Sequence, residues 1–181
     1  MIALDTFFNY IAVVIGGLLP IANPFSTAPL FISLTKHLTA EEQVRQADLA
    51  CVYMAIILMA FLFFGALILG FFGITIPGIR IAGGLVILYI GFGMLFPNEK
   101  QLPDDVIENA KQEINFAFTP LTMPMLSGPG AIAVILGFSA PIGLVPDIKG
   151  QIWGFVIAAI GILVTALICW LVLRVSRKIV P

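Results

Sequence analysis

The stretch that decides the fold reads Leu19-Pro20-Ile21-Ala22-Asn23-Pro24-Phe25-Ser26-Thr27-Ala28-Pro29-Leu30. One hundred residues later the chain reads Thr119-Pro120-Leu121-Thr122-Met123-Pro124-Met125-Leu126-Ser127-Gly128-Pro129-Gly130. The prolines match at a constant offset, and Thr27 and Ala28 pair with Ser127 and Gly128. Such a match in register indicates an internal repeat, so we expect a duplicated half.

Both proline clusters lie inside long apolar stretches, where a helix is otherwise expected. Each proline removes a backbone donor and clashes with the carbonyl four residues earlier. Three prolines within ten residues are more than one smooth bend absorbs. We therefore predict an unwound or re-entrant segment at Pro20–Pro29 and another at Pro120–Pro129. Backbone groups freed there must face protein or a wet cavity, because lipid cannot satisfy them.

The composition excludes most classes of soluble protein. Of the 181 residues, 60% are hydrophobic and only 10% are charged, whereas a soluble domain carries about 25% charged residues. Nine Lys and Arg stand against ten Asp and Glu, so there is no basic excess for nucleic acid. One His and two separated Cys offer little for a metal site. We expect an integral membrane protein that is not an enzyme and has no metal or cofactor.

The charges divide the chain into apolar stretches that are each long enough for one membrane span. The predicted fold is an all-α, polytopic membrane helix bundle with five spans, at residues 7–34, 47–72, 79–96, 118–140 and 151–173. Seven of the nine Lys and Arg fall on the loops and tail of one side. Because positive residues favour the cytoplasmic side, we expect the N-terminus outside and the C-terminus inside.

Three regions follow from this pattern. Residues 1–97 form a first half of three spans, residues 98–117 an acidic cytoplasmic linker, and residues 118–181 a second half of two spans. An odd number of crossings separates the two copies, so they enter the membrane in opposite directions, as in inverted-repeat transporters. The third span of the second half would start near position 180, so we expect an incomplete 3+3 repeat. Either a longer form or a homo-oligomer would supply the missing packing.

Two interpretations of the proline clusters remain open at this point: kinks that only shape the bundle, or a cavity that binds a polar solute. For the cavity, the predicted substrate-binding residues are Asn23, Pro24, Ser26, Thr27, Arg80, Thr122, Ser127 and Gly128. Arg80 opens the third predicted span, where it either snorkels to the interface or binds a substrate carboxylate. Asp48 opens the second, where it either binds a coupling ion or caps the helix.

Three motifs in order carry a family resemblance. They are Asn23-Pro24, then Gly78-Ile79-Arg80-Ile81-Ala82-Gly83-Gly84 with Gly91-Phe92, then Pro120-Leu121-Thr122-Met123-Pro124 with Ser127-Gly128-Pro129-Gly130. Together they resemble the MarC family of bacterial and archaeal inner-membrane proteins. The resemblance implies a multi-pass protein of the inner (plasma) membrane and a small secondary transporter or exporter, since some members are described as neutral amino acid transporters. Members usually have six spans.

The function we predict is secondary transport or export of a small polar solute, with a neutral amino acid as the expected class, by alternating access of two inverted halves. Its partners would be that small-molecule substrate and the lipid bilayer, and no nucleic acid. Two alternatives stay open. One is an ion or small-solute channel, in which the broken helices form a filter from backbone carbonyls. The other is a non-transporting membrane protein.

Overall fold

The computed structural model describes residues 4–96 and 117–176, and every regular element in this part is helical. In chain order these are α1 (Leu4–Ala22), α2 (Pro24–Thr35), α3 (Ala40–Phe71), α4 (Ile76–Leu95), the π-helix η1 (Ala117–Leu126), α6 (Pro129–Gly143) and α7 (Ile148–Ser176). The predicted linker at 98–117 lies outside the described residues except for Ala117.

Two helices, α3 and α7, are long and apolar enough to cross a membrane, and the pair α1–α2 makes a third candidate that bends by 41° at its break. At about 1.5 Å per residue, α3 and α7 both exceed the ~30 Å hydrocarbon core. The helices α4 and α6 are apolar but shorter. The protein is thus an all-helical bundle with two to three candidate spans and shorter apolar helices, and the count of five spans and the repeat remain predictions.

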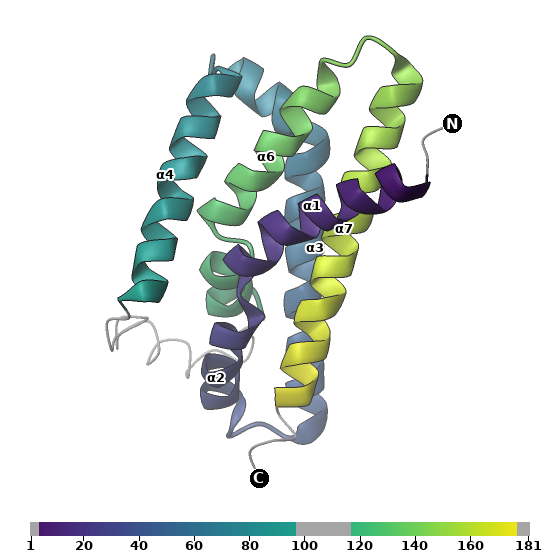
Figure 1. The fold of residues 1–181 in the computed structure, drawn as a ribbon. Coiled ribbons are helices and arrows are strands. Elements are labelled where there is room, and N and C mark those ends of the chain that lie inside the picture. The colour runs from purple at the N-terminus through teal and green to yellow at the C-terminus, as the bar shows by residue number, and fades with distance from the viewer. Residues whose placement is uncertain (1–3, 97–116, 177–181) are drawn as a thin grey trace.

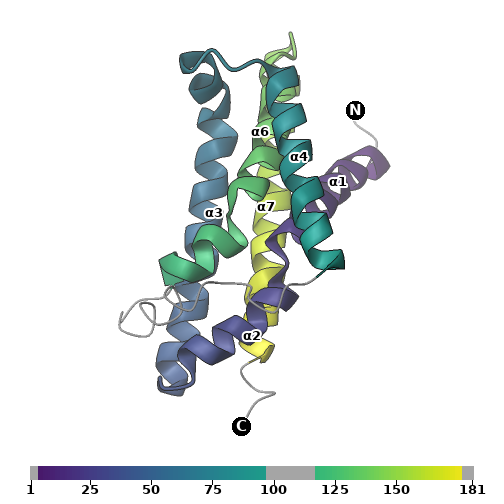
Figure 2. The same ribbon diagram turned by 90° about the vertical axis from the view of Figure 1, so that its left-hand side faces the viewer.

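The chain enters the bundle twice in opposite directions. From its start, α1–α2 runs down toward the end at which α3 begins, whereas η1–α6 runs up toward the opposite end (Figure 1). The two long helices α3 and α7 also run antiparallel. Figure 2 shows the same arrangement from the side, with both breaks part-way along the bundle.

Each broken helix packs on the long helix from the other part of the chain. The main neighbour of α1 and α2 is α7, while η1 and α6 pack on α3, and α4 packs on α6. One core joins them, with the fully buried side chains Leu18, Phe31, Met54, Leu58, Leu121, Ile135 and Ile162 among its members. The two parts of the chain are therefore interlocked rather than laid side by side.

Two glycines make these crossings possible. A Cβ added to Gly161 of α7 would lie 2.5 Å from Cγ1 of Val14 on α1. A Cβ added to Gly65 of α3 would lie 2.6 Å from Leu136 and 2.7 Å from Ser139, both on α6. Because glycine has no side chain, the broken helices approach the long helices more closely than other residues allow.

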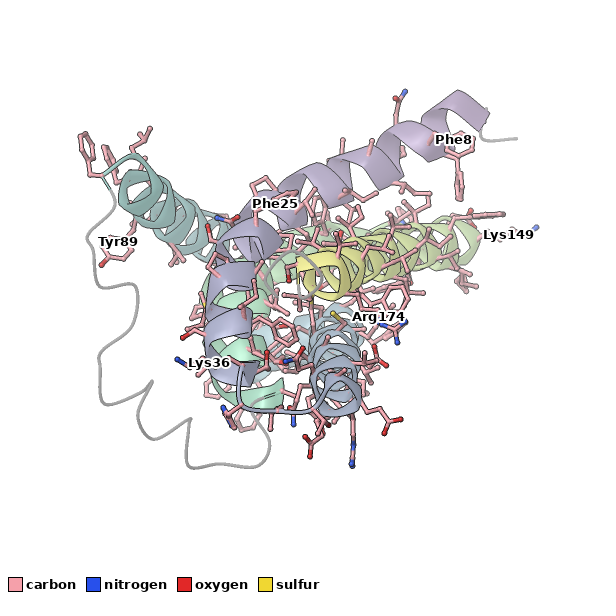
Figure 3. The ribbon with its side chains drawn as sticks, turned by 90° about the horizontal axis from the view of Figure 1, so that it is seen from below. Phe8, Phe25, Lys36, Tyr89, Lys149 and Arg174 are labelled. Carbon is pink, nitrogen blue, oxygen red and sulfur yellow. The ribbon has the colours of Figure 1, made fainter. Side chains whose placement is uncertain are left out.

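Large apolar side chains cover the outside, as expected where lipid is the solvent. Phe8, Phe25 and Tyr89, which are labelled in the view from below (Figure 3), are all exposed. The charged ends separate as well: Lys36 follows α2 and Arg174 lies in the last turn of α7, both at the lower end of the bundle in Figure 1, whereas Lys149 lies at the start of α7, at the upper end. The outer surface and the charged ends are what a membrane-embedded bundle requires.

Candidate functional site

The first break consists of one residue, Asn23, between α1 and α2. Its backbone adopts φ 35° and ψ 66°, the left-handed conformation that Asn tolerates better than most side chains. Its Oδ1 accepts a hydrogen bond from the backbone N–H of Ser26 at 3.2 Å, and its Nδ2 donates to Ser26 Oγ at 2.7 Å. Asn23 thereby caps the start of α2.

The residues after Asn23 close this break. Pro24 is buried at the first position of α2, where its missing N–H costs nothing. The hydroxyl of Thr27, also buried, donates to the carbonyl oxygen of Asn23 at 3.2 Å. The break is narrower than the predicted Pro20–Pro29, because Pro20 and Pro29 both lie inside helices. The chain therefore changes direction at a single residue, the N-cap Asn23.

The second break follows a segment with π-helical winding. The π-helix η1 spans Ala117–Leu126, and Ser127 and Gly128 separate it from α6. The buried hydroxyl of Thr122 lies 3.1 Å from the carbonyl oxygen of Ala50 on α3 and 2.5 Å from that of Ala117. Since a hydroxyl has one proton, the two carbonyls share it. Thr122 thus ties η1 to α3, and π-helical turns are frequent at functional sites.

Ser127 and Gly128 are less well satisfied than the residues of the first break. The backbone N–H of Ser127 donates to the carbonyl of Thr122 at 2.8 Å. The Ser127 hydroxyl is fully buried and has no hydrogen-bond partner in the described part of the chain. Gly128 is the N-cap of α6 but offers no side-chain hydrogen bond. The start of α6 therefore has no side-chain cap, with Pro129 exposed and Gly130 and Ala131 buried.

The two breaks share one core. Both α1 and α2 contact η1, and α1 also contacts α6. Gly17 of α1 faces Val134 and Phe138 of α6, at 3.4 Å and 3.6 Å from the position of an added Cβ. Seven of the predicted binding residues consequently belong to two breaks in neighbouring helices: Asn23, Pro24, Ser26, Thr27, Thr122, Ser127 and Gly128.

The remaining two predicted residues lie elsewhere. Asp48, in α3, accepts a hydrogen bond from Trp170 Nε1 at 2.6 Å and pairs with Arg174 Nη2 at 3.3 Å. The Arg174 guanidinium carbon also lies 4.4 Å from the centre of the Trp170 ring. Asp48 therefore joins α3 to α7. Arg80 belongs to α4, but its side chain lies outside the described part of the structure.

The MarC family of integral membrane proteins matches residues 8–181, nearly the whole chain. The chain belongs to the MarC family. It is 38% identical over 182 residues to the inner membrane protein MarC of Salmonella typhimurium strain LT2, which covers 95% of this chain and 80% of that relative. The MarC protein of Citrobacter koseri is 37% identical over 179 residues, with the same shares covered. No solved structure matches.

Sequence reasoning missed the partners of Asp48 in this MarC-family chain. Trp170 and Arg174 are four residues apart, so they share a face of α7. The predicted topology places both on the same side of the membrane as Asp48. The opposite charges of Asp48 and Arg174, at the same predicted side of the membrane, were a signal for this pair. The spacing in the sequence does not show that α3 and α7 are in contact there.

Proposed function

We propose that this MarC-family chain is a secondary transporter or exporter of a small polar solute in the inner membrane, and that its solute is a neutral amino acid. One observation carries the proposal: two helices that run in opposite directions are interrupted part-way along the bundle, and the interruptions meet in one core. Discontinuous helices at a repeat interface are where secondary transporters bind their substrates.

The packing of each broken helix on the long helix from the other part of the chain supports alternating access. Since α1–α2 packs on α7 and η1–α6 packs on α3, a tilt of one half carries a long helix against the broken helix of the other half. The break at Asn23 and the break at Ser127–Gly128 are the points at which each broken helix changes direction. In this proposal they act as hinges that open the site first to one side and then to the other.

The polar residues at the breaks would bind the solute. We assign Asn23, Ser26, Thr27, Thr122 and Ser127 to the lining and Pro24 and Gly128 to the backbone geometry. Arg80 of α4 remains a proposed additional partner of the solute, beside the residues of the two breaks, and Asp48 a proposed site for a coupling ion. We also propose that the N-terminus lies outside the cell and that the chain forms a homo-oligomer.

Purified protein in proteoliposomes tests transport directly. We expect uptake of a radiolabelled neutral amino acid that saturates and is accelerated by unlabelled solute on the opposite side. Asn23→Ala and Ser127→Ala should lower the flux more than they lower the melting temperature. Equal losses of flux and stability would favour simple kinks. Ohmic single-channel currents would identify a channel, and no flux of any solute would leave a non-transporting membrane protein.

A further inference from the structure

We infer that the start of α6 binds a carboxylate group of the solute, through the hydroxyl of Ser127 and the backbone N–H groups of Gly130 and Ala131. The inference rests on the proposed transport function and specifies which chemical group of the solute the second break holds. It also assigns different tasks to the two breaks.

The first observation is the uncapped helix start. A helix of 15 residues begins at Pro129, which has no N–H, and its N-cap Gly128 makes no side-chain hydrogen bond. The N–H groups of Gly130 and Ala131 follow in the first turn, and neither has a hydrogen-bond partner in the described part of the chain. Both residues are buried. First-turn N–H groups carry the positive end of the helix dipole, so they favour an anion.

The second observation is the orphaned hydroxyl beside that helix start. Ser127 comes directly before Gly128, its side chain is fully buried, and its Oγ has no hydrogen-bond partner in the part of the chain described. Buried hydroxyl groups are nearly always satisfied, so an orphaned one requires an explanation. A bound carboxylate would accept from the Ser127 hydroxyl and from the two backbone N–H groups together.

The other broken helix, α2, has a side-chain cap at its start. Asn23 Oδ1 accepts the backbone N–H of Ser26, so α2 carries its own cap. The two breaks therefore differ in one respect that matters for an anion: the start of α2 has a side-chain cap from Asn23, whereas the start of α6 has no side-chain cap. An anion entering the core between the breaks is expected to bind at α6.

The charge of the site selects a carboxylate over a phosphate. Neither η1 nor α6 contains Lys, Arg, Asp or Glu. The helix dipole supplies about half a positive charge, which suits a monoanion that carries its own ammonium group nearby. A phosphate dianion would keep most of its charge uncompensated in a buried site. The zwitterion of a neutral amino acid meets this requirement.

Thermal shift on the full chain in detergent tests the site. The probes are L-alanine, L-serine, L-threonine and L-leucine, each beside its carboxamide. We expect at least one acid to raise the melting temperature and its amide to have no effect. Ser127→Ala should weaken that affinity about tenfold without lowering the melting temperature of the free protein, because it removes a hydroxyl that has no partner. Ser127→Thr should retain binding.

Ser139→Ala is the matched control. Ser139 also lies on α6 with a buried hydroxyl that lacks a partner within the described residues, but it faces Gly65 of α3 rather than the start of the helix. Its substitution should leave the affinity unchanged. Three results would each overturn the inference: no acid binds, the amides bind as well as the acids, or Ser127→Ala and Ser139→Ala behave alike.

Flux measurements separate this inference from the proposed function. Flux of an uncharged solute that is unaffected by Ser127→Ala would support the proposed transporter and contradict the carboxylate site. Binding of an acid that depends on Ser127, without any flux in proteoliposomes, would leave the site standing and remove the transporter. Flux of an amino acid that is lost with Ser127→Ala and kept with Ser139→Ala would support both.

Discussion

A methyl group placed at Gly161 should force α1 away from α7. In Gly161→Ala the new Cβ would meet Val14 Cγ1 at 2.5 Å and Val14 Cβ at 2.7 Å, whereas ordinary contacts begin at 3.4 Å. The helices must therefore separate by about 0.9 Å, the difference between 3.4 and 2.5 Å. Rotation of the Val14 side chain does not relieve the clash, because Cβ is fixed to the backbone.

The cost follows from two opposing effects. Overpacking of a buried contact costs about 1–3 kcal/mol, and the upper end applies here because a whole helix must shift. Replacing Gly by Ala inside a helix returns about 1 kcal/mol. The net loss of about 2 kcal/mol should lower the melting temperature in detergent by roughly 4–8 °C for a chain of this size. Gly16→Ala is the control, because Gly16 on α1 has no atom within 4 Å of its added Cβ.

Placing the glycine on α1 instead of α7 should reverse the effect of Gly161→Ala on stability. Val14→Gly alone destabilises the protein, since a buried side chain is lost from α1. In that background Gly161→Ala should be stabilising, because its methyl group occupies the space that Val14 left. A double-mutant cycle on the melting data measures this coupling. Additive effects of the two substitutions, or a Gly161→Ala variant as stable as Gly16→Ala, would refute the close crossing of α1 and α7.

Three further predictions concern other contacts. Thr39 and Glu42 form a capping box at the start of α3, and the backbone N–H of Thr39 lowers the pKa of Glu42 below its usual value. Because the pKa of Glu42 is lower in the folded state, ionised Glu42 stabilises the protein above its unfolded-state pKa, and this stabilisation is lost as the pH falls through its folded-state pKa. The melting temperatures of Glu42→Gln and the parent should therefore differ above about pH 5 and converge in acid. Asp48→Ala and Trp170→Phe should each destabilise by about 1 kcal/mol, but less than additively together, since both remove the same 2.6 Å hydrogen bond; additive losses would contradict the α3–α7 link. A cysteine introduced at Asp104–Asp105 should resist an impermeant reagent added outside intact cells, and labelling there would reverse the predicted orientation.

The sequence supported the class of fold and the approximate limits of the helices. Charge spacing located the C-terminal end of α3 and both ends of α7 within three residues. The start of α3 was missed, because this helix begins at Ala40, seven residues before the predicted span, and continues through polar residues before the apolar stretch begins. The proline clusters located both broken segments. They overstated both segments. In the first, Pro24 occupies a position where its missing N–H is harmless, and Pro20 and Pro29 lie within helices. In the second, Pro120 and Pro124 lie within η1, and only Ser127 and Gly128 separate η1 from α6.

The tertiary contacts could not be read from the sequence. Nothing in the local pattern around Gly161 or Gly65 indicates which helix comes close, since apolar residues surround both glycines on all sides. Hydrophobic periodicity orients a helix in a soluble protein, but in a membrane the lipid-facing side is apolar as well. For the same reason the hydrogen bond from Trp170 to Asp48 could not be foreseen.

If the two proline clusters are copies of one repeat, as predicted, a single position explains the difference between the two breaks. At the offset of one hundred, Asn23 corresponds to Met123, which has no side-chain oxygen to cap a helix that starts at Pro124. The helical winding accordingly continues through Pro124 to Leu126, and the chain breaks four residues later than in the first half, at Ser127–Gly128. Pro129 then takes the first position of α6, whereas Pro29 lies inside α2. Substitution of one capping residue thus accounts both for the shifted break and for the helix start that is left without a cap.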